Sequence, residues 1–268
     1  PRSTLFPYTT LFRSMTARSD LGAKNIFMLE NLRFWAEEEA GDKSFAKQVA
    51  SGFDVYVNDA FSVCHRAHAS LVGFPEFTKE KCAGFLLEEE YENLKKVKNE
   101  PDHPAVLVIG GAKIETKLPV INFMIDKYDK ILVGGKIANE AIDQGINLGE
   151  KVILPVDFAP AGKERERLDI GVKTSYIFTK EIDQAATIVW NGPMGKFEEY
   201  DCANGTKEIL RAIVERKEKA LTVLGGGETV TVVNKFGSIN DFDYVSMSGG
   251  AMLEFLSGKE LPGLKALE

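Results

Sequence analysis

Short apolar runs alternate with longer amphipathic stretches along the chain after residue 104. One such stretch, residues 204–219, places Ile209, Leu210 and Ile213 on one helical face and charged side chains on the opposite face. Strand-sized runs separated by helices predict βαβ units and a parallel sheet that helices cover on both sides. We therefore predict a doubly wound, Rossmann-like α/β domain. Its six strands are expected at residues 105–109, 130–133, 151–154, 187–190, 220–224 and 244–247.

The part of the chain before residue 86 carries fewer elements than a separate hydrophobic core needs. Two apolar runs, at residues 25–29 and 54–59, flank an amphipathic stretch at 42–51. This pattern predicts a partial α/β N-terminal domain at residues 15–85.

A connecting helix is predicted at residues 86–98. Leu87, Tyr91 and Leu94 form its apolar stripe, whereas Glu90 and residues 95–98 form the side expected to face solvent. The sequence NEPDHP at 99–104 then breaks the helix. Residues 86–104 are therefore predicted to be an interdomain helix and linker, and residues 105–268 the C-terminal domain.

The first residues, 1–14, read PRSTLFPYTTLFRS and follow neither helical nor strand periodicity. They also lack the charged and apolar regions of a signal peptide. The stretch resembles the translation of a sequencing adapter, so we interpret it as a non-native extension. Met15 is a candidate initiator methionine, although the sequence after it resembles the interior of a coding sequence.

Composition narrows the class of protein. With 268 residues, 44% of them hydrophobic, the chain can fill a core, and it has no apolar run near the ~20 residues of a membrane span. The net charge of -7 and the isoelectric point near 5.3 argue against a general nucleic-acid binder. The three scattered cysteines, Cys64, Cys82 and Cys202, favour neither a disulfide framework nor a zinc site. We expect a soluble protein of the reducing cytoplasm.

Glycines come immediately after several of the predicted strands, in the sequences IGGAK, VGGK, WNGPMG and LGGGET. Glycine after a parallel strand lets backbone N–H groups approach a phosphate, and the helix that begins there adds a favourable dipole. Such loops share one sheet edge, which favours a single ligand site over the alternative of simple tight turns. The phosphate-binding patterns GxxxxGK[ST] and GxGxxG are absent, so a different mode of nucleotide binding is required.

Several charged side chains follow predicted strands. Lys113 and Lys117 are four residues apart in the opening turn of a predicted helix, so both ammonium groups are expected to point the same way and clamp a phosphate chain. Two solvated lysines are the alternative. Arg33 and Arg66 are suited to binding carboxylate or phosphate. Three further side chains, Asp59, His65 and His68, accompany Arg66, but a metal site on the histidines lacks a third ligand.

The sequence resembles the phosphoglycerate kinase family. The resemblance rests on LENLRF, NDAFSVCHRAHAS, GGAKIETK, TIVWNGPMGKFE, NGT, LGGGET and SGGAMLEFLSGKELPG in this order, and it extends from about residue 25 to 268. It implies a two-domain glycolytic kinase that transfers the acyl phosphate of 1,3-bisphosphoglycerate to MgADP, giving 3-phosphoglycerate and MgATP, or runs in reverse. It further implies a monomer in the cytoplasm without nucleic-acid or membrane partners.

The resemblance also assigns roles to individual residues. It implies that Arg33 and Arg66 hold the glycerate substrate, that Lys113 stabilises the moving phosphoryl group, and that Gly249 and Gly250 present N–H groups to it. Glu198 is implied to contact the ribose and Glu228 the Mg²⁺ ion. The nucleotide-binding set that it implies is Gly110, Gly111, Lys117, Gly134, Gly135, Asn191, Pro193, Glu198, Gly226, Gly227, Glu228 and Thr229.

Several positions depart from the family pattern. Glu228 stands where the family has Asp, Lys136 replaces the third glycine of a triplet, and Met247 and Ser248 alter a TGGGA motif. The family's N-terminal substrate contacts lie upstream of this chain, so we expect a fragment that is inactive as written. Two alternatives stay open: a nucleotide-binding remnant without transferase activity, and a Rossmann-type dehydrogenase, against which the missing dinucleotide fingerprint counts.

Overall fold

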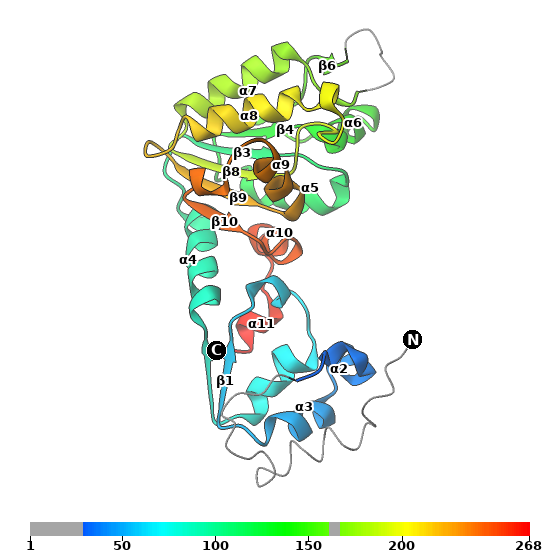
Figure 1. Cartoon of the computed structure of the whole chain (residues 1–268), viewed down its shortest axis with the longest axis vertical. Coiled ribbons are helices and arrows are strands. Elements are labelled where there is room, and N and C mark those ends of the chain that lie inside the picture. Colours follow the sequence, from blue (N-terminus) through cyan, green and yellow to red (C-terminus); the bar gives the residue numbers. More distant parts are fainter. Residues whose placement is uncertain (1–28, 161–166) are drawn as a thin grey trace. The chain divides into compact units, whose positions relative to one another are not determined.

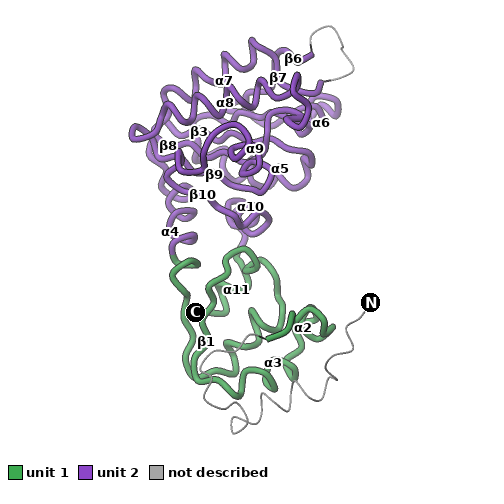
Figure 2. The backbone as a smooth tube through the Cα atoms, in the orientation of Figure 1, with its two compact units in different colours: residues 1–88, 260–268 green, residues 89–259 purple. Residues whose placement is uncertain are grey.

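The computed structural model describes residues 29–160 and 167–268. Most of the strand predicted at 25–29, together with residues 1–14 and Met15, lies outside the described residues. The chain divides into two compact units, which consist of residues 1–88 with 260–268 and of residues 89–259 (Figure 2). Each unit is described by itself.

The larger unit is built on a six-stranded parallel sheet, which confirms the predicted fold class. The strand order is β5-β4-β3-β8-β9-β10, so the chain starts in the middle, grows to one edge, and returns to grow to the other. The central strands are fully buried because helices cover both faces. The strands are β3 (Ala105–Ile109), β4 (Lys130–Val133), β5 (Val152–Ile153), β8 (Thr187–Asn191), β9 (Leu221–Gly225) and β10 (Tyr244–Ser246).

The helices of this unit form two groups around the sheet (Figure 1). One group contains α5 (Ile114–Met124), α6 (Gly135–Asp143) and α10 (Gly250–Leu256). The other contains α7 (Val172–Gln184), α8 (Asn204–Val214) and α9 (Gly227–Phe236). Right-handed crossovers place α5 and α6 on the sheet face opposite α8 and α9. The 3-10 helices η6 (Tyr200–Cys202) and η7 (Ile239–Asp241) lie in the connections.

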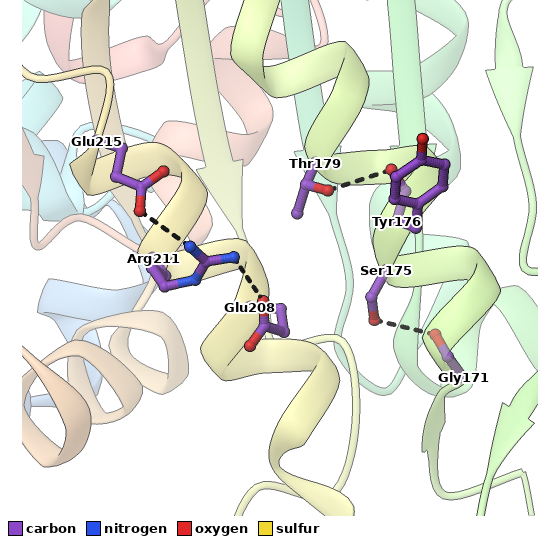
Figure 3. A network of polar contacts seen from close by, with 7 residues as sticks. All are labelled: Gly171, Ser175, Tyr176, Thr179, Glu208, Arg211 and Glu215. Atoms are coloured by element: carbon purple, nitrogen blue, oxygen red, sulfur yellow. Dashed lines mark hydrogen bonds and ion pairs between the residues drawn. The ribbon is translucent and has the colours of Figure 1, made fainter.

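The amphipathic stretch that begins at residue 204 forms helix α8, with its apolar face in the core. Ile209, Leu210 and Ile213 are buried in the core, as predicted. On its exposed face, the Arg211 guanidinium donates to Glu208 at 2.9 Å and to Glu215 at 3.0 Å (Figure 3). Such exposed pairs add little stability, so burial of the apolar face holds the helix in place.

A short antiparallel ladder between α6 and α8 in the sequence was not predicted. Strand β6 (Phe158–Ala159) pairs with β7 (Asp169–Ile170). Asp169 is buried, and its carboxylate accepts hydrogen bonds from the N–H groups of Ile170 at 2.9 Å and Gly205 at 2.8 Å. The ladder thereby fixes the first turn of α8.

Helix α4 (Phe85–Asn99) corrects the expected solvent-facing side at two positions, because Val97 is fully buried and Glu90 is buried as well. Glu90 was expected to face solvent, but it is buried and only 8% exposed. Its carboxylate accepts a hydrogen bond from the Tyr244 hydroxyl at 3.0 Å and another from the Ser246 hydroxyl. Glu90 lies three residues after Leu87 and four before Leu94, so it belongs to the buried stripe, where two hydroxyl donors compensate its desolvation.

The smaller unit contains a two-stranded parallel sheet. Strand β1 (Val55–Asn58) lies within the predicted run 54–59, and it pairs with β2 (Glu80–Ala83), which was not predicted because its sequence EKCA lacks an apolar pattern. The helices are α2 (Ala36–Ala40), α3 (Lys43–Ala50) and α11 (Pro262–Lys265). Single turns are formed by η2 (Leu32–Phe34), η3 (Phe61–Val63), η5 (Phe74–Phe77) and the π-type turn η4 (Ala69–Gly73).

The C-terminal residues 260–268 belong to the smaller unit, whereas the sequence analysis placed them in the C-terminal domain. The Gly263 N–H donates to the Cys64 carbonyl at 2.8 Å, and the Lys81 ammonium donates to the Ala266 carbonyl at 2.9 Å. A side chain at Gly263 would lie 2.9 Å from the backbone of Cys64, so only glycine permits this approach. These contacts are long-range in sequence, and hydrophobic periodicity cannot reveal them.

Two further observations concern the described residues only. None of the helices within 29–160 and 167–268 combines the length and the apolar composition needed to cross a bilayer. Cys64, Cys82 and Cys202 all carry free thiols.

Candidate functional site

The central pair of strands, β3 and β8, ends where the strand order reverses. Ile109 and Asn191, the last residues of these strands, are register partners. The Gly110 N–H donates to the Asn191 carbonyl at 2.9 Å, and the Gly111 N–H donates to the Pro193 carbonyl at 3.1 Å. In open α/β sheets the crevice beyond this reversal is where ligands bind.

Glycine is required here because main chains come into contact. A side chain on Gly110 would lie 2.1 Å from the Pro193 carbonyl oxygen. Gly192 adopts a φ of +97°, and a side chain on it would lie 2.3 Å from the Gly110 carbonyl oxygen. On the neighbouring strand, the Gly135 N–H donates to the Met194 carbonyl at 2.9 Å. The glycine loops of three strands are therefore joined by backbone hydrogen bonds at one sheet edge.

A first cavity of about 230 Å³ opens at this edge beside helix α9. Gly226 precedes the helix with a φ of +92°, and the first turn consists of Gly227, Glu228 and Thr229. The N–H groups of a first helical turn have no partner within the helix and favour an anion. We refer to this space as the α9 cavity; its lining is Lys117, Asn191, Gly192, Gly226, Gly227, Glu228, Thr229, Gly249, Gly250 and Leu253.

Lys117 brings a cation into the α9 cavity from helix α5. Its ammonium donates to the Asn191 side-chain carbonyl, and the Asn191 amide donates in turn to the Gly225 carbonyl at 2.9 Å. Burial lowers the pKa of Lys117 from 10.5 to about 8, and the Glu228 carboxylate opposes this effect. A polyanion in the cavity would restore the charged form of this lysine.

Lys113 does not share the helical geometry that the sequence predicted. It precedes α5 as the N-cap residue, with extended backbone at φ -131° and ψ 107°. The expectation that both lysines lie within the opening turn of the helix is therefore wrong for Lys113. Lys113 is exposed, whereas Lys117 is half-buried.

Thr229 supports the loop with its side chain. The Thr229 hydroxyl donates to the Gly225 carbonyl at 2.7 Å and accepts from the Gly192 N–H at 2.8 Å. The hydroxyl is fully buried, so a ligand in the cavity meets the backbone at this position rather than the side chain. Gly134, in contrast, lies behind the cavity and donates its N–H to the Ile109 carbonyl at 3.0 Å.

A second, larger cavity of about 310 Å³ adjoins the first and shares Glu228 with it. We call it the α6 cavity, because Gly135, Lys136 and Asn139 of that helix form one wall. The remaining lining residues are Gly111, Ala112, Arg167, Leu168, Pro193, Gly195, Lys196, Phe197, Glu198 and Glu228. Sequence reasoning missed Asn139, Arg167 and Leu168, because no motif marks them, and it did not single out Phe197 within the motif TIVWNGPMGKFE.

Glu228 is the carboxylate that both cavities share. It is exposed, and its Oε2 would lie 3.5 Å from a side chain placed on Gly111. Among residues 29–160 and 167–268, no group of three or more His, Cys, Asp or Glu side chains is arranged to hold a metal ion. A single carboxylate beside a phosphate site nevertheless fits Mg²⁺, which is commonly held by one or two carboxylates, substrate phosphates and water.

The predicted site residues of the smaller unit lie near β1. Arg33 is exposed in η2, and Arg66 is half-buried in the turn after η3. Asp59 has a structural role, because its carboxylate accepts hydrogen bonds from the N–H groups of Leu86 at 2.7 Å and Leu87 at 3.1 Å at the start of α4.

The two histidines next to Arg66 are not on a helix. The His68 ring nitrogen lies 3.7 Å from the buried Glu38 carboxylate. Glu38 also accepts hydrogen bonds from the Ser70 N–H at 2.9 Å and the Ser70 hydroxyl at 2.5 Å. Helix α2 is thereby attached to the segment that carries Arg66.

Comparison with known proteins identifies relatives of this chain. A sequence model of the family described as "Phosphoglycerate kinase" matches residues 8–159 and 149–259. The first range begins inside residues 1–14, which the sequence analysis set aside and which lie outside the described residues.

Individual relatives support the same family. Phosphoglycerate kinase from Acidobacterium capsulatum is 40% identical over 289 residues, which cover 92% of this chain and 71% of the relative. The enzyme of Pseudothermotoga lettingae is 40% identical over 91% of this chain and 71% of its own length. Among solved structures, phosphoglycerate kinase from Coxiella burnetii is similar with a TM-score of 0.80 and 34% identity, covering 88% of this chain and 71% of that one. That of Pyrococcus horikoshii has a TM-score of 0.76 and 35% identity, with coverages of 89% and 71%.

Proposed function

The chain belongs to the phosphoglycerate kinase family, and from this premise we propose how its residues transfer a phosphoryl group between 1,3-bisphosphoglycerate and ADP. The family is one of phosphotransferases that use nucleotides. The observation that carries the proposal is the half-buried Lys117, which lines the same cavity as the first turn of α9 at the reversal point of the sheet. Because the chain belongs to a family of kinases, we no longer consider the alternative of a Rossmann-type dehydrogenase.

We assign the nucleotide phosphates to the α9 cavity and the nucleoside to the α6 cavity. The N–H groups of Gly227 and Glu228 and the Lys117 ammonium favour phosphate in the first. In the second, Pro193 and Phe197 offer apolar surface for a base, and Glu198 offers a carboxylate to the ribose hydroxyls. The cavities adjoin at Glu228, which lets one nucleotide occupy both.

Glu228 is proposed as the carboxylate that holds Mg²⁺ next to the nucleotide phosphates. When bound, the ion would supply charge neutralisation on the phosphate oxygens. The longer side chain of glutamate, compared with the aspartate of the family pattern, lets the carboxylate reach across to Gly111, as the 3.5 Å approach to that position indicates. Glu228 also favours the charged form of Lys117.

We propose that Lys113, Gly249 and Gly250 contact the phosphoryl group while it moves. Lys113 is exposed at the N-cap of α5, and both glycines line the α9 cavity. An ammonium and backbone N–H groups stabilise the charge that spreads over the phosphoryl oxygens in the transition state. The glycerate substrate is assigned to Arg33 and Arg66 of the smaller unit, because guanidinium groups bind carboxylate and phosphate in a bidentate manner.

The transfer can be tested on the purified chain. A coupled assay with ATP, 3-phosphoglycerate and glyceraldehyde-3-phosphate dehydrogenase decides between transfer and the inactive fragment that the sequence predicts: NADH oxidation that depends on 3-phosphoglycerate shows transfer. Calorimetry should show MgADP binding in either case. MgADP binding without turnover would favour the nucleotide-binding remnant. Absence of both would refute the assignment of the cavities.

We further propose that the protein acts as a monomer in the cytoplasm. Free thiols at Cys64 and Cys202, both buried, are compatible with a reducing compartment. Light scattering coupled to size-exclusion chromatography checks the oligomeric state, and cell fractionation checks the compartment.

A further inference from the structure

The α6 cavity contains a cation that the phosphate-binding machinery does not use. Three basic residues line this cavity: Lys136, Arg167 and Lys196. None of the three lines the α9 cavity, so they lie at the end of the site that we assign to the nucleoside.

Two of these three cations are held by neighbouring groups. The Arg167 guanidinium donates to Asp143 at 2.8 Å and lies 5.2 Å from the centre of the Phe158 ring. The Lys196 ammonium forms a hydrogen bond to Glu199. Both side chains are therefore occupied within the protein.

Lys136 is held much more weakly. Within the described part of the chain, the carboxylate paired with its ammonium is Glu140, at 3.9 Å, and the Lys136 side chain is 69% exposed. Glu140 is itself engaged, since its other carboxylate oxygen accepts the Ile114 N–H at 3.0 Å. An exposed pair of this length contributes little, so the Lys136 ammonium can turn toward a ligand.

The backbone beneath Lys136 is fixed. Lys136 is the second residue of α6, and the preceding Gly135 donates its N–H to the Met194 carbonyl at 2.9 Å. The following Ile137 donates to the Gly111 carbonyl at 3.1 Å. A flexible ammonium thus stands on a rigid loop at the cavity wall.

The chemistry of an ammonium group defines which bases it recognises. It has three donors and no acceptor. Purines with a carbonyl at position 6, such as guanine and hypoxanthine, present two adjacent acceptors, O6 and N7, whereas adenine presents N7 beside a donating amino group. We propose that Lys136 donates to the O6 and N7 edge of the bound base and makes the α6 cavity favour 6-oxopurine nucleotides over adenine nucleotides. This inference rests on the proposed assignment of the nucleoside to the α6 cavity.

ADP and IDP provide a close comparison, because the two bases share N7 and differ only in the group at position 6 and in the proton that hypoxanthine carries on N1. Calorimetric titration of the purified chain with each nucleotide gives two dissociation constants, whether or not the chain turns over. We expect the wild type to bind IDP at least as tightly as ADP. Lys136→Met keeps the stem and removes the charge, and it should weaken IDP binding about fivefold to tenfold while changing ADP binding less than about twofold.

Two variants control this comparison. Lys173→Met removes a lysine from the same position of a helix, the second residue of α7, but outside both cavities, so both dissociation constants should stay unchanged. Lys136→Arg keeps a cationic donor and should keep the preference for IDP. The melting temperature of Lys136→Met should equal that of the wild type, because the side chain is exposed.

The outcomes separate this inference from the proposed function. Equal weakening of ADP and IDP by Lys136→Met would place the ammonium on ribose or phosphate and overturn the inference. So would unchanged affinities in that variant, or a wild type that clearly prefers ADP. A wild type that binds neither nucleotide would refute the proposed function itself.

Discussion

The half-buried Lys117 of the α9 cavity should make the proposed nucleotide binding depend on pH. In the free protein, burial lowers the pKa of Lys117 to about 8, so about nine in ten of these side chains are neutral at pH 9. A bound polyphosphate requires the ammonium form and raises the pKa again. Binding at pH 9 therefore includes the uptake of almost one proton, and the affinity for ADP should fall about tenfold between pH 7 and pH 9.

The same pKa difference affects stability. The folded pKa of about 8 lies below the value of 10.5 of an unperturbed lysine, so the unfolded chain binds more protons between these two values. Stability should accordingly be lowest below pH 8 and rise as the pH increases from about 8 to about 10.5. The contribution is about 3 kcal/mol, at roughly 1.4 kcal/mol for each tenfold change in proton affinity.

Calorimetry in buffers of different ionisation enthalpy measures the proton uptake directly. Lys117→Arg is the matched control, because arginine stays charged across this range and should abolish the pH dependence while keeping a cation in the cavity. An ADP affinity that stays constant from pH 7 to pH 9, without proton uptake, would show that Lys117 is charged in the free protein. The assigned effect of burial would then be wrong.

Four further substitutions test other parts of the site and its support. Gly192→Ala should lower the free energy of unfolding in urea by about 3 kcal/mol or more, because the added Cβ would lie 2.3 Å from the Gly110 carbonyl oxygen. Gly145→Ala is the control: Gly145 has a φ of +62° but open space around it, so the substitution should lower the free energy of unfolding by only about 1–2 kcal/mol. Burial raises the pKa of Asp169 to about 7, so between about pH 4 and pH 7 the folded protein keeps a proton on this carboxyl group that the unfolded chain has lost. The free energy of unfolding should therefore fall as the pH rises through this range, and Asp169→Asn should remove that fall. Urea unfolding at pH 4 and pH 7 measures the difference. Glu90→Ala should lower the free energy of unfolding by about 2–3 kcal/mol, since two hydroxyl donors lose their acceptor, while Glu90→Gln should cost less. Lys113→Ala should lower kcat by about 10²-fold or more and leave the Kd for ADP nearly unchanged, and equal losses in both would limit Lys113 to binding.

The sequence predicted the larger sheet because its strands are buried on both faces. Runs such as AVLVI and TIVW are apolar at every position, and the glycines that follow them mark the strand ends. Strands β2 and β7 escaped prediction because their stability comes from long-range pairing and from groups such as the buried Asp169, not from an apolar run. The periodicity of apolar residues indicates which segments neighbouring helices bury, but it does not indicate short strand pairings of this kind.

The residues of the candidate site likewise fall into those that the sequence predicted and those that it did not. Lys117 and Gly227, which line the α9 cavity, were predicted from motifs because phosphate binding favours a cation and glycines after a strand. Asn139 reaches the α6 cavity from α6, and Arg167 reaches it from the residues before β7. Nothing in the local sequence distinguishes either from a surface residue. The extended backbone of Lys113 was also missed, because helix-start position was inferred from spacing alone.

The departures from the family pattern fall on side chains and leave the backbone frame intact. The hydrogen bonds that join the strand ends run between main-chain groups of Gly110, Gly111, Gly135 and their partners, and they do not involve Lys136 or Glu228 side chains. A substitution at these two positions therefore changes the charge and shape of the cavities without moving their walls. On the proposed assignments, positions 136 and 228 govern the selectivity for the base and the placement of the metal, whereas Gly192 is required by its φ of +97° and by the nearby Gly110 carbonyl oxygen.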